Sequence, residues 1–287
     1  MKRTKMTCPT STSHRLVSSL VSVLISTAAM AIAKVAPPDI VVIMADDMGY
    51  SDLGCMGSEI RTPHLDSLAG NGLLFTRFDN TVILFLSDNG SSDEVINGTN
   101  TRHGNFPQGG TRPAVMPGGP ETYASVGKGW ANASNTPFRR YKKWTHEGGI
   151  ATPLIVHWPS GIFANGEIRR QVGHVIDIMA TAVDLAGTTY PSRRGGHDII
   201  PLEGISLRPA FADGDRPLSR EALYWEHMGP RAIRTGDWKL VGTRNSWKLF
   251  DLENDPIETR DLAADHPDRV ATMADMWEAW AERSLVK

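Results

Sequence analysis

Two apolar runs, each followed by acidic or amide side chains, constrain the fold most. The first is Ile40–Met44 (IVVIM), five apolar and mostly β-branched residues that lead into Asp46 and Asp47. The second is Val82–Leu86 (VILFL), which leads into Ser87-Asp88-Asn89-Gly90. Uninterrupted apolar runs of this length are typical of strands that are buried on both faces, as in parallel sheets. The two runs therefore predict buried strands of an α/β fold.

The side chains that follow these runs predict a metal site. Open α/β sheets place ligands at the carboxyl ends of their strands, and adjacent carboxylates repel unless they are solvated or share a cation. If the two strands are neighbours, Asp46, Asp47, Asp88 and Asn89 meet at one point. Four oxygen side chains without His or Cys suit Ca²⁺ or Mg²⁺ and not zinc. The structural alternative is an ordinary solvated acidic turn after each strand.

The first 33 residues have the composition of a signal peptide. Lys2, Arg3, Lys5 and Arg15 precede the apolar stretch Leu16–Ala33, which ends in a small-x-small sequence. Several hydroxyl residues interrupt that stretch, and it is short for a membrane span. We therefore expect cleavage after residue 33, no stable membrane anchor, and export to the periplasm or the extracellular space.

The charge balance limits the classes of binding partner, and the cysteine content limits the covalent cross-links. Without residues 1–33 the chain keeps 26 Lys and Arg against 32 Asp and Glu, a net charge of about −6. This balance argues against nucleic-acid binding and gives no reason to expect attraction to an anionic membrane surface. Cys55 is then the single cysteine, so we expect no internal disulfide and a fold held by its core and a bound metal.

Local sequence signals between residues 62 and 187 predict further helices, strands and turns. Thr62 and Pro63 mark the start of a short helix that Gly72 ends, and Gly187 ends a helix that starts at Asp177. Residues 91–140 are rich in Gly, Pro, Asn and Ser, which indicates irregular structure, and Glu147-Gly148-Gly149 indicates a tight turn. Further strands are expected at Leu74–Phe78 and Thr152–Trp158.

The C-terminal part changes to short alternating strands. This pattern predicts an antiparallel meander followed by an amphipathic helix at Pro267–Ser284, whose apolar stripe we interpret as core packing. Residues 34–212 then form the α/β core, and residues 213–287 form an antiparallel subdomain with a terminal helix. The strands are Ala232–Arg234, Trp238–Val241 and Trp247–Asp251, and the stripe is Met273, Met276, Trp277 and Trp280.

Six segments, taken in order, resemble the sulfatase family of the alkaline-phosphatase-like superfamily. The resemblance covers nearly the whole chain after residue 33 and is closest to bacterial arylsulfatase-like members. It implies an α/β fold with a mixed, largely parallel sheet flanked by helices. The segments are Asp46–Phe78, Phe85–Gly90, Tyr141–Pro159, His174–Gly187, Ala232–Val241 and Leu249–Ala263.

The resemblance also implies a function and a site. It implies hydrolysis of sulfuric esters, with a small-molecule or polysaccharide sulfate ester as substrate. The same four oxygen side chains are implied as Ca²⁺ ligands, with Mg²⁺ as the alternative, and Lys142 as the lysine that contacts the sulfate. Lys143 takes that role if the register shifts by one residue. A cation on one side and an ammonium on the other suit the charge that develops on a sulfate. Without the resemblance, we would interpret both lysines as part of a solvent-exposed basic turn.

One family motif is missing. Family members use a Cys or Ser in Cys/Ser-x-Pro-x-Arg, oxidised to formylglycine, as the nucleophile, and this motif belongs shortly after a segment like FTRFDNT. Here Asp79-Asn80-Thr81 leads directly into the second apolar run, and Cys55 lacks the Pro and Arg. We interpret the join at Asn80-Thr81 as an in-frame deletion or a gene-model error. The resemblance then implies a sulfatase that is inactive or strongly impaired.

Two other functions remain open from the sequence. One is a phosphatase or phosphodiesterase relative with Thr81 or Thr76 as nucleophile. The other is a metal-binding pseudoenzyme or gene fragment, in which lost strands would leave apolar strand edges exposed.

Overall fold

The computed structural model describes most of the chain after Ala36, with gaps. Within the described part, no helix is both long enough and apolar enough to cross a membrane. The expected signal peptide, the expected strand Leu74–Phe78, the stop at Gly72 and the candidate Thr76 lie outside the described residues. These are 37–70, 80–95, 125–164, 166–212, 214, 216–243 and 246–286, together with the backbone of 100–101, 104–105, 108–109 and 122–123.

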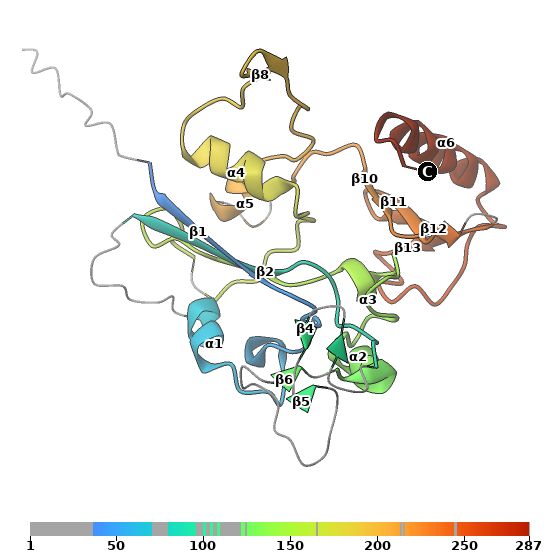
Figure 1. The fold of residues 1–287 in the computed structure, drawn as a ribbon. Coiled ribbons are helices and arrows are strands. Elements are labelled where there is room, and N and C mark those ends of the chain that lie inside the picture. The colour runs from blue at the N-terminus through green and yellow to red at the C-terminus, as the bar shows by residue number, and fades with distance from the viewer. Residues whose placement is uncertain are drawn as a thin grey trace, which may run out of the picture. The chain divides into compact units, whose positions relative to one another are not determined.

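A mixed three-stranded sheet carries both predicted apolar runs (Figure 1). Strand β1 (Asp39–Ala45) pairs in parallel with β2 (Thr81–Ser87), with every residue from Asp39 to Ala45 in register. Strand β7 (Leu154–His157) pairs antiparallel with the other edge of β2. The α/β prediction and the neighbouring placement of the two runs are thus confirmed, and β2 is the central strand.

Strand β2 is buried along its whole length, as predicted. Successive side chains of a strand point to opposite faces, so β2 contributes to two separate apolar clusters. Ile83 and Phe85 pack with Leu53 and Leu68 on one face. On the opposite face Val82 and Leu84 pack with Leu185, Leu207 and Phe211.

Strand β1 is exposed, so the prediction that both runs are buried is wrong for it. The side chains of Val41, Val42, Ile43 and Met44 are between 40% and 52% exposed. The reason is its position, because β1 is an edge strand and β2 is its single partner among the described residues. The sequence of β1 is suited to a buried environment that the described residues do not provide.

The predicted helix starts are confirmed. Helix α1 (Pro63–Gly70) follows the 3-10 turn η1 (Gly54–Met56). The carbonyl of Thr62 accepts the first helical hydrogen bond, from the Asp66 amide at 2.8 Å, while its hydroxyl accepts from the Gly54 amide at 2.8 Å. Helix α4 (Asp177–Leu185) is followed by Gly187 with φ of 61°, the left-handed conformation expected after a helix end.

The prediction of irregular structure for residues 91–140 is wrong for one segment. Residues 127–134 form helix α2 (Gly127–Ser134), in which Ala131 is fully buried. Tertiary packing outweighs the poor helix propensity of its Gly, Asn and Ser residues. Helix α3 (Glu147–Ile150) is a single helical turn where a tight turn was expected. The other described elements of this region are the two-residue strands β3 (Asn100–Thr101), β4 (Gly104–Asn105), β5 (Gln108–Gly109) and β6 (Thr122–Tyr123).

The predicted C-terminal meander and helix are confirmed. Four antiparallel strands in sequential order form one sheet, and α6 (Pro267–Arg283) lies against it (Figure 1). Met273 and Trp277 are buried in the shared core, and Met276 and Trp280 are partly buried beside them, as the stripe predicted. The strands are β10 (Leu223–Glu226), β11 (Arg231–Thr235), β12 (Trp238–Thr243) and β13 (Ser246–Asp251). Between α4 and β10 lie the hairpin of β8 (Arg193–Arg194) and β9 (His197–Asp198) and the short helix α5 (Arg208–Ala212).

Candidate metal centre

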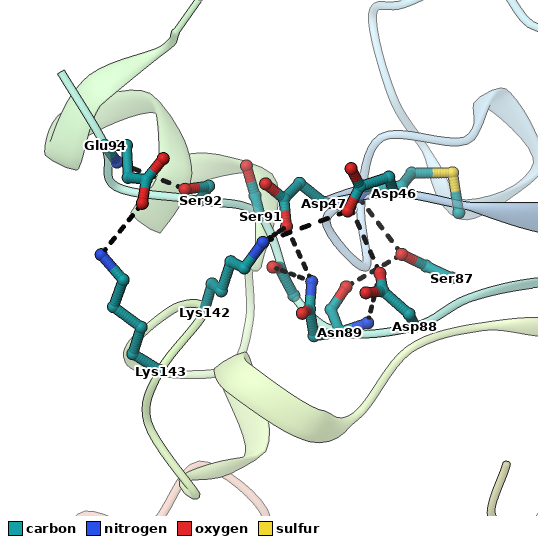
Figure 2. A network of polar contacts seen from close by, with 12 residues as sticks. Asp46, Asp47, Ser87, Asp88, Asn89, Ser91, Ser92, Glu94, Lys142 and Lys143 are labelled. Carbon is teal, nitrogen blue, oxygen red and sulfur yellow. Dashed lines mark hydrogen bonds and ion pairs between the residues drawn. The ribbon is translucent and has the colours of Figure 1, made fainter. Parts of the chain in front are cut away.

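Three carboxylates meet at the carboxyl ends of β1 and β2. Asp46 and Asp47 follow β1 and Asp88 follows β2, and because Ala45 pairs with Ser87 both turns begin at the same level of the sheet. One carboxylate oxygen from each lies within 4.8 Å of the other two (Figure 2). The structure therefore brings together three of the four side chains in the predicted ligand set as a single acidic cluster.

The fourth side chain, Asn89, also lies in this cluster. Its amide nitrogen donates to Oδ1 of Asp47 at 2.9 Å and to the carbonyl of Gly90 at 3.2 Å. A half turn of the amide group exchanges its nitrogen and oxygen, so the same position offers a fourth oxygen to a cation.

Backbone hydrogen bonds fix the two acidic turns against each other. Asp47 has φ of 58°, the left-handed region that is uncommon for residues other than Gly, Asn and Asp. Its amide donates to Oδ1 of Asp88 at 3.3 Å, and the Asn89 amide donates to the same oxygen at 2.9 Å. The Ser87 hydroxyl accepts from the Met48 amide at 3.2 Å and donates to the Asn89 carbonyl at 2.9 Å. Sequence reasoning missed Ser87 as a positioning residue, although its place directly before Asp88 was visible.

Lys142 is the lysine that faces the acidic cluster. Its ammonium forms an ion pair with Asp47 and lies 4.0 Å from Oδ1 of Asp46 (Figure 2). Partial burial lowers the pKa of Lys142. The hydrogen bond to Asp47 and the charges of Asp47, Asp46 and Asp88 together raise the pKa by more than burial lowers it, so the pKa lies above its ordinary value. Lys142 is therefore a firmly charged ammonium.

The fallback residue Lys143 points elsewhere. Its ammonium lies 3.4 Å from Glu94 and 3.8 Å from Asp93, both outside the acidic cluster. The structure thus places Lys142, and not Lys143, beside the acidic cluster.

The segment that carries Lys142 packs directly on the segment that carries Asp88 and Asn89. The Lys142 amide donates to the Ser91 carbonyl at 3.0 Å, and the Gly90 amide donates to the Gly149 carbonyl at 3.1 Å. A Cβ on Gly90 would lie 2.0 Å from the carbonyl oxygen of Gly148, so glycine alone permits this approach.

A cavity of about 270 Å³ opens beside the acidic cluster. Asp47, Asp52 and Glu94 line it together with several serines and Trp130, whose side chain is 71% exposed. Ile60 and Val126 add apolar surface to that of Trp130, so the cavity has a mixed polar and apolar lining.

Thr81, the nucleophile candidate that the structure describes, lies away from the acidic cluster. Thr81 is buried at the opposite end of β2 from Asp88, about 20 Å along the strand. Cys55 lies in η1, and its amide donates to Asp66. Partial burial raises the pKa of the Cys55 thiol, and the charge of Asp66 raises it further, so this thiol is a poor source of thiolate.

Comparison with known proteins decides the family. The sulfatase family model matches residues 38–78 and 77–188, which together make up slightly more than half of the chain. The chain belongs to the sulfatase family. A second model, described as the C-terminal part of N-sulphoglucosamine sulphohydrolase, matches residues 138–283 of this sulfatase-family chain.

Several curated sulfatases and a solved structure are similar to the chain. An uncharacterized sulfatase of Schizosaccharomyces pombe is 30% identical over 69% of this chain and 37% of its own length. Human N-acetylgalactosamine-6-sulfatase is 28% identical over 71% of this chain and 32% of its own length. The crystal structure of Ps i-CgsB matches with a TM-score of 0.51 and 26% identity, over 72% of this chain and 37% of that one. The chain thus spans about a third of the length of these relatives.

Proposed function

We propose that this sulfatase-family chain binds Ca²⁺, with Mg²⁺ as the alternative, through Asp46, Asp47, Asp88 and Asn89. The observation that carries this proposal is the convergence of the three carboxylates on one point, with the ammonium of Lys142 beside them. Three like charges within 4.8 Å of one another repel, and one ammonium offsets only part of that charge. The all-oxygen donor set fits a hard divalent cation.

We further propose that Lys142 contacts the sulfate of a sulfuric ester. When bound, the divalent cation would supply charge stabilisation to a sulfate oxygen. The ammonium of Lys142 would supply a second positive charge from the 141–146 segment, and its ion pair with Asp47 holds it in place. For substrate we propose a small-molecule or polysaccharide sulfate ester. The names of arylsulfatase from Klebsiella aerogenes, 29% identical over 46% of this chain and 28% of its own length, and of the human relative support this class.

We propose that hydrolysis is lost or strongly reduced in this chain because it lacks the nucleophile. The two blocks of the family match meet at residues 77 and 78, directly before the join at Asn80-Thr81, which supports a missing central block. The hydroxyl of Ser87, directly before Asp88, is buried and hydrogen-bonded to the backbone, so it is a poor substitute nucleophile.

Cation binding is tested by titration calorimetry of the chelator-treated chain with Ca²⁺ and Mg²⁺. We expect saturable binding that Asp88→Asn weakens at least about tenfold, because one ligand charge is lost. Asp93→Asn is the matched control, since Asp93 pairs with Lys143 outside the acidic cluster. Equal binding by both variants and the unchanged chain would remove the basis for this site.

The loss of turnover is tested separately, with a nitrophenyl sulfate and Ca²⁺. We expect release of nitrophenol many orders of magnitude slower than from an intact sulfatase. Turnover near that of an intact enzyme would show that the chain holds a nucleophile we have not recognised. A nitrophenyl phosphate run beside it distinguishes the phosphatase alternative.

A metal-binding pseudoenzyme or gene fragment is the second candidate. The exposed apolar side chains of β1 favour it, because a fold complete in itself rarely leaves such a strand uncovered. Sequencing the locus around the codons for Asn80 and Thr81 tests this: an intervening coding block would identify a gene-model error.

We also propose that the chain is exported after cleavage of residues 1–33, and that residues 213–287 form a separate subdomain. N-terminal sequencing of the exported protein tests the cleavage. A start near residue 34 is expected, and a start at Met1 would contradict it.

A further inference from the structure

A buried ion cluster lies between the C-terminal sheet and α3. Lys239 on β12 is fully buried, and its ammonium lies 2.6 Å from Oε1 of Glu147 and 2.9 Å from Oε1 of Glu258. Glu258 is fully buried as well, and Glu147 is nearly so. This Lys239 cluster joins three segments that are distant in sequence.

Further hydrogen bonds bind Glu258 to the same region. Oε2 of Glu258 accepts from the Glu147 amide at 2.9 Å, and its carbonyl accepts from Nη1 of Arg139 at 2.7 Å. The side chain of Glu258 thus caps the first turn of α3, while the ammonium of Lys239 offsets the charge of both carboxylates.

From α3 the contacts continue to the metal-centre residues. The Gly149 carbonyl accepts from the Gly90 amide, next to Asn89. The Gly148 amide donates to the Arg139 carbonyl at 3.0 Å, and this closes the loop that carries Lys142. A Cβ on Gly148 would lie 2.3 Å from the carbonyl oxygen of Arg139, so backbone meets backbone here with no space for adjustment.

We propose that Lys239 is a positioning residue: its buried ammonium fixes α3, and α3 in turn holds Asp88, Asn89 and Lys142 in the geometry of the acidic cluster. Lys239 touches none of these three residues and acts through Glu147 and the backbone of Gly148 and Gly149. Loss of the ammonium leaves two buried carboxylates facing each other without a counter-charge, which favours separation of α3 from β12. The C-terminal sheet therefore contributes to the site without placing a side chain in it.

Hydrogen exchange of the full chain tests this positioning role without any metal. In Lys239→Met, which keeps the length of the side chain and removes its charge, we expect amides in the peptide covering Asp88–Ser91 to exchange at least about tenfold faster. Peptides covering α4 should change less, because no hydrogen bond or ion pair seen among the described residues joins α4 to the Lys239 cluster. The control is Leu240→Ala, the next residue of β12, which packs on the opposite face in the core with α6. It should lower overall stability without a selective change at Asp88–Ser91.

If Lys239→Met fails to fold, Glu147→Met provides a second test, because it removes the carboxylate through which Lys239 holds α3 and leaves the Lys239–Glu258 ion pair in place. Unchanged exchange at Asp88–Ser91 in the variant that folds, or equal acceleration at α4, would overturn the inference. A second readout rests on the proposed function: Ca²⁺ affinity should fall about tenfold in Lys239→Met and stay unchanged in Leu240→Ala. Absence of Ca²⁺ binding in the unchanged chain would count against the metal site alone, because the exchange experiment decides the positioning role independently.

Discussion

Substitution of Gly90 by Ala should destabilise the chain because the new methyl group has no space. Gly90 does not have a positive φ, so the cost is one of packing and not of backbone conformation. Its Cβ would lie 2.0 Å from the carbonyl oxygen of Gly148, well inside the 3.4 Å at which ordinary contact begins. The nearest obstacle is the backbone carbonyl of Gly148, so a side-chain rotation cannot relieve the overlap.

The magnitude follows from two contributions. Separation of the two backbones breaks the Gly90–Gly149 hydrogen bond, worth about 1 kcal/mol, and overpacking of this kind costs about 1–3 kcal/mol. The sum is about 2–4 kcal/mol in the free energy of unfolding, which for a chain of this size lowers the melting temperature by roughly 5–15 °C.

The assay is urea and thermal unfolding followed by circular dichroism, with Gly129→Ala as the control. Gly129 lies inside α2 and a Cβ there meets nothing within 4 Å, so alanine should stabilise the chain by about 0.5–1 kcal/mol. If the free energy of unfolding of Gly90→Ala lies within about 0.5 kcal/mol of that of the unchanged chain, the contact between α3 and the Asp88–Ser91 segment is not as close as described.

Two other predictions concern His146 and β1. Burial, followed by the charges of Lys239 and Arg139, lowers the pKa of His146 to about 3. The unfolded chain therefore binds a proton that the folded chain does not between about pH 6.5 and pH 3, so His146 reduces stability as pH falls through this range, by up to about 1.4 kcal/mol per unit. His146→Phe should flatten the dependence of the urea midpoint on pH, and an unchanged slope would contradict the burial of a neutral ring. On β1, the double substitution of Val42 and Met44 by Lys should raise the monomeric fraction in size-exclusion chromatography at little cost in stability, because these side chains are 44% and 52% exposed. An unfolded product would instead show that the strand is covered in solution.

The strands and helices could be predicted where the pattern is local. The apolar runs of β1 and β2, the Thr62-Pro63 helix start and the alternating C-terminal strands all carry their signal within a few residues. The convergence of the three carboxylates could also be predicted, because two strands that end in acids bring them together whenever the strands are parallel neighbours.

Other features depend on partners that lie far away in the chain. The exposure of β1 depends on what covers it and not on its own sequence, which reads as buried. Helix α2 forms from poor helix formers because Ala131 packs into the structure. The ion pair of Lys239 joins residues that are 92 positions apart, and alternation along β12 predicted only that Lys239 and Leu240 face opposite ways.

The start of β2 has a consequence for how such proteins can be rebuilt. The Asp39 amide donates to the Asn80 carbonyl at 2.8 Å, and the Trp158 indole donates to Oδ1 of Asn80 at 3.0 Å. These bonds anchor Asn80 beside the first residue of β1, and the register of the two strands follows from there. A polypeptide of any length could leave and re-enter the chain at this one place, as in a domain insertion. The acidic cluster and the nucleophile can then be exchanged separately, so this chain can serve as a host into which catalytic blocks from intact sulfatases are grafted one at a time.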